Sequence, residues 1–242
     1  MRLRKSHPHL ASHNIESLDM RIVTNEHLVQ RSKRTATWLF FFSLGILFLG
    51  FFAANGSLFG LVDTETVNRD LYLVGMPIIL VIGFTSTMIS VRMTNLWVRV
   101  PRPEDAIKDG LKGISNKSAM YNYFHLPARH VLICPQGIFV MITRFQDGRI
   151  VCQNDKWRVK RSFISQIFSI FRLDGIGDPT VEAKAAADHI RFLLEDYDPD
   201  IPVYPVIIFH DPRAELFVEG CSVPALYLDP KRTPNLKDYV RD

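Results

Sequence analysis

The chain has 242 residues, of which 47% are hydrophobic, and a formal net charge of only +4. Basic residues on either side of an apolar stretch account for most of this charge, which suits anionic lipid better than nucleic acid. The cysteines, Cys134, Cys152 and Cys221, are odd in number and form no CxxC pair. They predict reduced thiols in a cytosolic domain and argue against a structural zinc site.

Two long apolar runs follow a polar N-terminal segment. Residues 38–62 and 71–91 carry no charged side chain inside the run. About 20 apolar residues, rising about 1.5 Å each, cross a hydrocarbon core about 30 Å thick. The runs therefore predict transmembrane spans at about residues 38–60 and 71–91, joined by a tight polar loop. The alternative, buried helices of a soluble core, is disfavoured because the first run has no polar face.

Basic residues set the predicted orientation of this hairpin. Lysine and arginine are frequent before the first span and after the second, whereas the loop between them contains only Arg69. The positive-inside rule then places both termini in the cytoplasm. Glycines at positions 45, 50, 75 and 83 would let the two helices approach closely. Since neither span contains an ionisable residue, we expect an anchor rather than a transporter.

The chain therefore divides into three predicted parts. These are a polar, basic cytoplasmic tail at residues 1–36, a transmembrane hairpin at residues 37–92 and a cytoplasmic domain at residues 103–242. In the tail, Ile15, Leu18 and Ile22 would share one face of a short interfacial helix. The prediction is a two-span protein of the cell membrane.

The domain after the spans begins with a predicted helix at residues 104–117. Four β-rich runs come next, at residues 122–126, 130–134, 138–143 and 149–153. The turn sequence Pro135-Gln-Gly137 joins the second run to the third, so these two predict a β-hairpin. A further turn at Asp147 and Gly148 leads into the fourth run.

A longer helix is predicted to begin at Asp178. Asp178 suits the N-cap, and Pro179 suits the first helical position. Residues 203–209 then predict a buried strand. Further predicted elements are a short helix or loop at residues 162–171, strands at 216–218 and 225–228, and a closing helix at 235–241. This order predicts an α/β or α+β fold, and we favour an α/β fold in which helices flank a small central mixed sheet.

Several of these motifs, in this order, resemble the nuclease-related (NERD) domain. The stretch from Arg129 to Arg144 resembles the core hairpin of that family, and Trp157 follows where the family has a Trp. The residues from Asp178 to Glu182 resemble its Asn-Pro-x-x-Gln helix start. The resemblance covers about residues 104–239 and implies a restriction-endonuclease-like core.

The family resemblance also implies Mg²⁺-dependent phosphodiester hydrolysis, with an Asp before the first hairpin strand and a Glu-x-Lys on the second. These positions hold Arg129, Ile142 and Arg144. A cation and a hydrocarbon thus replace the two carboxylates, and Glu182 replaces the Gln of the helix motif. We therefore expect no catalytic residues, no metal site and no cofactor. The alternative is an active Mg²⁺-dependent nuclease with relocated carboxylates, for which Asp147 and Asp155 are the nearest candidates.

Basic side chains around Trp157 form a candidate surface for nucleic acid or lipid. Its members are Arg144, Arg149, Lys156, Arg158, Lys160 and Arg161. Basic residues interleaved with an aromatic suit a phosphate backbone, but a solvated edge or a face toward anionic lipid is the favoured explanation. Together the predictions describe a membrane-anchored, catalytically silent nuclease-related domain that acts as a binding module. Its expected partners are the lipid bilayer and either nucleic acid or another protein, with no small-molecule substrate evident.

Overall fold

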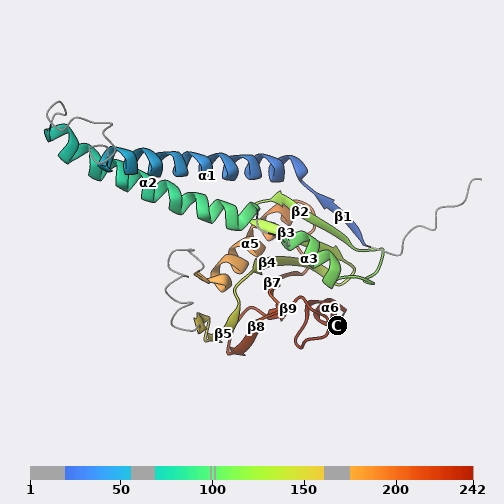
Figure 1. Ribbon diagram of the computed structural model, residues 1–242. Helices are drawn as coiled ribbons and strands as arrows, with labels where there is room; N and C mark the ends of the chain where they lie inside the picture. The colour runs from blue at the N-terminus through green and yellow to red at the C-terminus, as the bar shows by residue number, and fades with distance from the viewer. Residues whose placement is uncertain (1–19, 56–68, 99, 101, 161–174, 242) are drawn as a thin grey trace, which may run out of the picture.

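The structure is a computed structural model and describes residues 20–55, 69–98, 100, 102–160 and 175–241. Two long helices, α1 (Glu26–Asn55) and α2 (Arg69–Trp97), extend away from a mixed α/β domain (Figure 1). The predicted interhelical loop, apart from its last residues, and the element predicted at residues 162–171 lie outside the described residues.

Helices α1 and α2 pack along one another as a hairpin and are both long and apolar enough to cross a bilayer. Their facing serines, Ser43 and Ser86, share a hydrogen bond of 2.7 Å between hydroxyl oxygens. A Cβ atom on Gly83 would come within 3.2 Å of Ile46 on the facing helix. The prediction of close approach is thus confirmed at Gly83 and Gly50, but a Cβ on Gly45 or Gly75 would have no neighbour within 4 Å.

Both helices are longer than the predicted spans. Helix α1 begins at Glu26, before the apolar run, and α2 continues through polar residues to Trp97. The chain just before α1 does not form the predicted interfacial helix at Ile22, which lies in strand β1 (Arg21–Thr24). At Ile22 that prediction is wrong, because Ile22 pairs with Met120 at a sheet edge, a partner far away in the sequence. The other two residues of the predicted helix, Ile15 and Leu18, lie outside the described residues.

The main sheet has six strands in the order β1-β2-β3-β4-β7-β9. The strands after β1 are β2 (Ala119–His125), β3 (Ala128–Cys134), β4 (Gly137–Arg144), β7 (Val203–Phe209) and β9 (Ala225–Tyr227). Strands β2, β3 and β4 run antiparallel, whereas β4, β7 and β9 run parallel. The predicted hairpin around Pro135-Gln-Gly137 is therefore confirmed as β3 and β4.

A second sheet has three strands in the order β6-β5-β8. They are β5 (Gly148–Gln153), β6 (Lys156–Lys160) and β8 (Ala214–Glu219). The predicted mixed α/β class is therefore confirmed, and the main sheet is mixed as predicted, whereas this second sheet was not predicted. The turn before Gly148, whose φ is +81°, carries the chain out of the main sheet, and β5 then pairs in parallel with β8.

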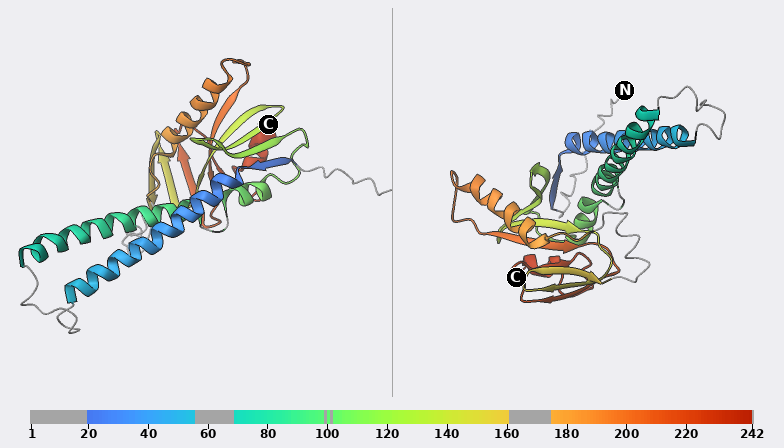
Figure 2. Two further views of the ribbon diagram at one scale, coloured as in Figure 1. Left: turned by 90° about the horizontal axis from the view of Figure 1, so that it is seen from above. Right: turned by 90° about the vertical axis from the view of Figure 1, so that its left-hand side faces the viewer.

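Helices cover both faces of the main sheet, as the two views in Figure 2 show. Helix α5 (Pro179–Leu194) packs on one face, and α3 (Pro103–Gly110) and α6 (Leu236–Arg241) contribute to the core on the other. Side chains alternate along β4, so Ile142 faces α5 and Met141 faces the opposite core. The helix predicted at residues 104–117 ends early, at Gly110, because the next residue, Leu111, leaves helical geometry with a φ of −95° and a ψ of 9°. Gly110 itself packs so close to Leu228 that a Cβ would lie 2.7 Å away.

The start of α5 agrees with its local sequence. The Asp178 carboxylate accepts a hydrogen bond from the backbone N–H of Val181 at 3.1 Å, and Pro179 occupies the first helical turn. This cap places the first turn of α5 beside the carboxyl ends of β4 and β7, where open α/β sheets form their ligand crevices.

Candidate functional site

A pocket of about 360 Å³ lies between the last turns of α2, the ends of the central strands and the start of α5. Its charged lining residues are Arg92 from α2, Arg129 from β3, Arg144 from β4 and Glu182 from α5. Thus three of the residues singled out from the sequence, Arg129, Arg144 and Glu182, meet in one cavity. A volume of this size suits a small ligand or the headgroup of a larger one.

Arg144 is fixed from several directions. Its guanidinium lies 2.8 Å from the Glu182 carboxylate and donates a hydrogen bond of 3.2 Å to the backbone carbonyl of Ile176. The neighbouring Gln146 donates to the carbonyl of Gly175 at 3.3 Å. These contacts tie the end of β4 to the segment that leads into α5, so one wall of the pocket is held in place by charge-assisted bonds.

Arg129 differs from Arg144 in its contacts. Within the described part of the chain, its guanidinium makes no ion pair or side-chain hydrogen bond. Burial is the main cause that lowers the pKa of Arg129, and the positive charges of Arg144 and Arg92 lower it further. Glu182 acts in the opposite direction. Removing a cation from water without a counter-charge is unfavourable, so this arginine favours an anion in the pocket.

The remaining position of the family motif, Ile142, is not among the residues that line the pocket. Its side chain is buried in the core against α5, with 6% of the residue exposed. Glu182 is the one carboxylate that lines the pocket among the described residues, and it is paired with Arg144. The cavity therefore offers a divalent cation one engaged carboxylate and three arginines, whereas Mg²⁺ prefers several free oxygen ligands.

His130 forms part of the pocket floor and is fully buried. The side-chain amide of Asn122 donates to the hydroxyl of Thr24 at 3.1 Å, which turns the amide oxygen toward His130. The His130 Nδ1–H then donates to that oxygen at 2.9 Å. Burial lowers the pKa of His130 to about 3, with Arg129 adding to the effect, so the ring is neutral at ordinary pH.

The last residue of α2 contacts the domain at the edge of this pocket. The Trp97 ring lies 5.2 Å from the ring of Tyr123, which has a φ of +65° at an irregularity in strand β2. Tyr123 donates a 2.9 Å hydrogen bond to the buried Glu104 carboxylate, which also accepts from Arg102 at 2.9 Å. Sequence reasoning missed Tyr123, because a positive φ at a non-glycine residue leaves no sequence signal.

The residues of the predicted basic surface separate in space. Lys156, Arg158 and Lys160 are exposed along one face of β6, and Arg149 lies opposite Lys160 on β5. Arg149 stacks over the ring of Phe217 on β8, 4.0 Å from its centroid. Arg144 instead lies in the pocket, and Arg161 is outside the described residues. Trp157 packs against the core and donates to the Thr180 hydroxyl at 2.8 Å.

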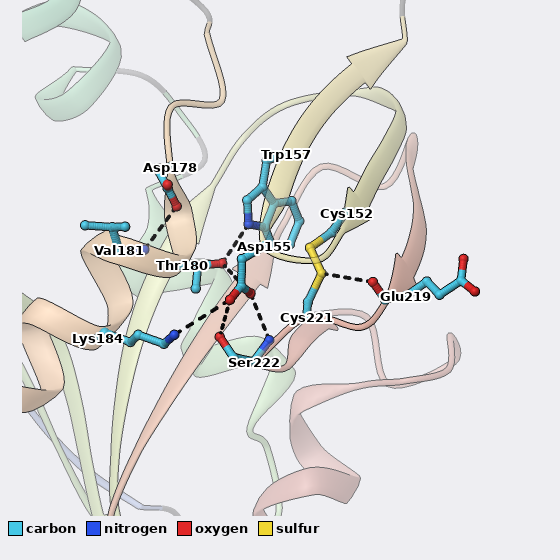
Figure 3. The surroundings of a disulfide bond; sticks show 10 residues. All are labelled: Cys152, Asp155, Trp157, Asp178, Thr180, Val181, Lys184, Glu219, Cys221 and Ser222. Carbon is cyan, nitrogen blue, oxygen red and sulfur yellow. Dashed lines mark hydrogen bonds and ion pairs between the residues drawn. A yellow bond between two sulfur atoms is a disulfide. The ribbon is translucent and has the colours of Figure 1, made fainter.

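Cys152 and Cys221 form a disulfide beside the second sheet (Figure 3). The expectation of unpaired thiols is therefore wrong for these two residues, although Cys134 is free and buried. The spacing in sequence gave no hint, because the parallel pairing of β5 with β8 brings Cys152 near the turn at Cys221. With Asp155, the two sulfur atoms form a group that could hold a metal ion only after reduction of the disulfide.

Neither relocated-ligand candidate lines the pocket. The Asp155 carboxylate accepts hydrogen bonds from the Ser222 hydroxyl at 2.7 Å and the Ser222 backbone N–H at 2.8 Å, which lower its pKa (Figure 3). Asp147 forms an ion pair with Arg213 at 3.1 Å. Both carboxylates support the second sheet rather than the cavity.

Comparison with known proteins relates part of this chain to a family. Residues 104–210 match the family described as NERD, the nuclease-related domain. No curated protein and no solved structure matches the chain. The match begins at Glu104 in helix α3 and ends at His210, just after β7, so β8, β9 and α6 lie beyond it. The part of the chain that matches the nuclease-related (NERD) domain is therefore residues 104–210, which follow two long apolar helices.

Proposed function

We propose that the chain is a membrane-anchored nuclease-related domain with a restriction-endonuclease-like core that binds a ligand without cleaving nucleic acid. The observation that carries the proposal is the composition of the pocket. Arg129 and Arg144 occupy positions at which the family resemblance implies a metal-binding Asp and a Lys, while Ile142, in place of the Glu, faces the core. Positive charge at such a site repels Mg²⁺ and attracts anions.

Exposed apolar side chains support the membrane anchor. Trp38, Phe41 and Val81 are each at least 65% exposed. In a soluble helix, few large apolar side chains are exposed to this extent. A bilayer would cover these side chains, and Trp38 and Trp97 would lie near the headgroups on one side.

For orientation we propose that both termini face the cytoplasm, because basic residues flank both outer ends of the hairpin. The disulfide argues for the opposite orientation, since disulfides persist in oxidising compartments. Protease added to intact spheroplasts that express the full chain should leave the domain uncut, whereas lysed spheroplasts should lose it. Cleavage in intact spheroplasts would place the domain outside the cytoplasm.

A cleavage assay tests the proposed lack of catalysis. The full chain, in nanodiscs of neutral lipid, should leave single- and double-stranded DNA and RNA intact with Mg²⁺ or Mn²⁺. Metal-dependent cleavage that co-elutes with the protein and disappears in Glu182→Gln, Asp147→Asn or Asp155→Asn would instead support the alternative of an active nuclease with relocated ligands. The Glu195→Gln variant is a matched control, because Glu195 lies at the far end of α5.

A further inference from the structure

Among the described residues, those that line the pocket carry more positive than negative charge. Arg92, Arg129 and Arg144 line it together, and Glu182, the one lining carboxylate in the described part of the chain, is ion-paired with Arg144. Arg129 makes no side-chain hydrogen bond or ion pair within the described residues. A partly buried guanidinium with free donors forms its strongest contacts with carboxylate or phosphate oxygens, which it can bind in a bidentate manner.

One wall of the pocket belongs to the end of a predicted membrane helix. The last two turns of α2 contribute Arg92, Asn95, Leu96 and Trp97 to the lining of the cavity. The apolar part of α2 ends directly before Arg92, so this wall lies where a bilayer changes from hydrocarbon to headgroups. On α1, Arg31, Lys33 and Arg34 precede the apolar residues at the same end of the hairpin.

We propose that the pocket binds the phosphate of an anionic phospholipid headgroup, with Arg129 and Arg92 as its ligands and Arg144 as a third positive charge. This inference rests on the proposed function, because a pocket filled by metal ions would have no need of these arginines. The lipid would enter from the bilayer that contains α2, and its acyl chains would remain beside the helix. The bound headgroup would fix the angle between the anchor and the nuclease-related domain.

A nucleic-acid strand fits this pocket less well. Because α2 forms a wall of the cavity, a polymer would have to pass between the domain and the bilayer to reach Arg129. The exposed cations on β6 offer a nucleic acid a more open surface, and they lie on a different sheet. The phosphate of a lipid headgroup has a shorter path to Arg129 than the phosphate of a nucleic acid.

The test uses the full chain in a non-ionic detergent and counts bound lipids by native mass spectrometry. Dioleoyl phosphatidylglycerol should bind in preference to dioleoyl phosphatidylcholine. Arg129→Gln and Arg92→Gln should each weaken phosphatidylglycerol binding about tenfold, which is the effect of one charge-assisted hydrogen bond. Arg158→Gln, an equal charge change on the exposed face of β6, should change it less than about twofold.

Two variants guard against misfolding as an explanation. Arg129→Lys keeps the positive charge and should retain part of the preference for phosphatidylglycerol, while Arg92→Gln changes an exposed position on α2. If Arg129→Gln and Arg158→Gln weaken phosphatidylglycerol binding equally, the lipid is attracted by diffuse charge and the proposed binding pocket is overturned. Equal binding of phosphatidylglycerol and phosphatidylcholine to the wild type would overturn the proposal as well.

Competition separates the possible sources of the phosphate. A single-stranded DNA oligonucleotide or millimolar inorganic phosphate should not displace phosphatidylglycerol. Displacement by DNA would assign the pocket to nucleic acid, and displacement by inorganic phosphate would assign it to a soluble anion; either result overturns the lipid proposal. The failure of the proposed function is distinct from these results, because it would appear as metal-dependent cleavage in neutral nanodiscs.

Discussion

The guanidinium of Arg144 lies 2.8 Å from the carboxylate of Glu182 and joins the end of strand β4 to the first turn of helix α5. The pair uses the only carboxylate that lines the pocket among the described residues. The side chain of Arg144 is largely buried, whereas that of Glu182 is 55% exposed, so Glu182 can be replaced without opening the core. This exposure allows the charge of the pocket to be tested directly.

Glu182→Gln should raise the affinity of the full chain for phosphatidylglycerol. The change removes the negative charge from the pocket and releases Arg144 from its ion pair, so we expect tighter binding by about threefold or more. Stability should change by less than about 1 kcal/mol, because the carboxylate is more than half exposed. Native mass spectrometry and a thermal melt measure the two effects. Unchanged or weaker lipid binding would contradict the assignment of the pocket to anions.

His130 should make the stability of the domain depend on pH. Its folded pKa of about 3 lies below the ordinary value of 6.5, so the unfolded chain binds a proton more readily between these values. Stability is fully present above about pH 6.5 and falls with decreasing pH, by up to about 1.4 kcal/mol per unit from this one residue. Thermal melts of the full chain at several pH values measure the slope.

The matched comparison is His130→Asn against His125→Asn, an exposed histidine at the end of β2. Only His130→Asn should make the stability of the chain depend less steeply on pH. If His130→Asn fails to fold, histidine-labelled protein gives the answer by NMR. The ring signal of His130 should not titrate between pH 7 and about pH 4.5. A His130 ring that protonates near pH 6 would refute the predicted slope.

Reducing agent should destabilise the domain through Cys152 and Cys221. The disulfide closes a sequence separation of 69 residues, and in the chain-entropy description a loop of this length contributes about 4 kcal/mol. In urea titrations, dithiothreitol should lower the stability of the wild type and of Cys134→Ser, but not of Cys221→Ser. If dithiothreitol has no effect on the wild type, the two thiols are unpaired in solution.

Gly83→Leu should loosen the helical hairpin. A Cβ there would already lie 3.2 Å from Ile46, so a larger side chain must push α1 and α2 apart, at a cost of about 1–3 kcal/mol. Gly75→Leu is the control, because no atom lies within 4 Å of its Cβ position. Cysteines introduced at Ser43 and Ser86 report the separation through the yield of their cross-link, measured by peptide mass spectrometry. Equal yields in the two variants would show that Gly83 does not set the packing.

Local sequence signals predicted much of the domain. Pro135 and Gly137 mark the turn between β3 and β4, and Asp178 with Pro179 marks the first turn of α5. Each of these depends on neighbouring residues, which is why spacing and residue type are enough to find it. The family resemblance also picked out Arg129, Arg144 and Glu182, which the structure brings into one pocket.

Features that depend on distant pairing could not be predicted in this way. Strand β1 forms only because Arg21 pairs with Ala119, and the disulfide forms because β5 pairs with β8. The wall that α2 gives to the pocket depends on how Trp97 meets Tyr123. These contacts cannot be predicted from a single sequence, since they depend on tertiary packing and not on the periodicity of neighbouring residues.

Metal binding is the most direct test of the central claim, which is that the pocket accepts anions and not the divalent cation of a nuclease. Unlike a cleavage assay, it requires no choice of substrate. Electron paramagnetic resonance of Mn²⁺ with the full chain in phosphatidylcholine nanodiscs should show only free hydrated ion at micromolar metal. One bound Mn²⁺ per chain that is lost in Glu182→Gln, but retained in Asp155→Asn, would contradict the account.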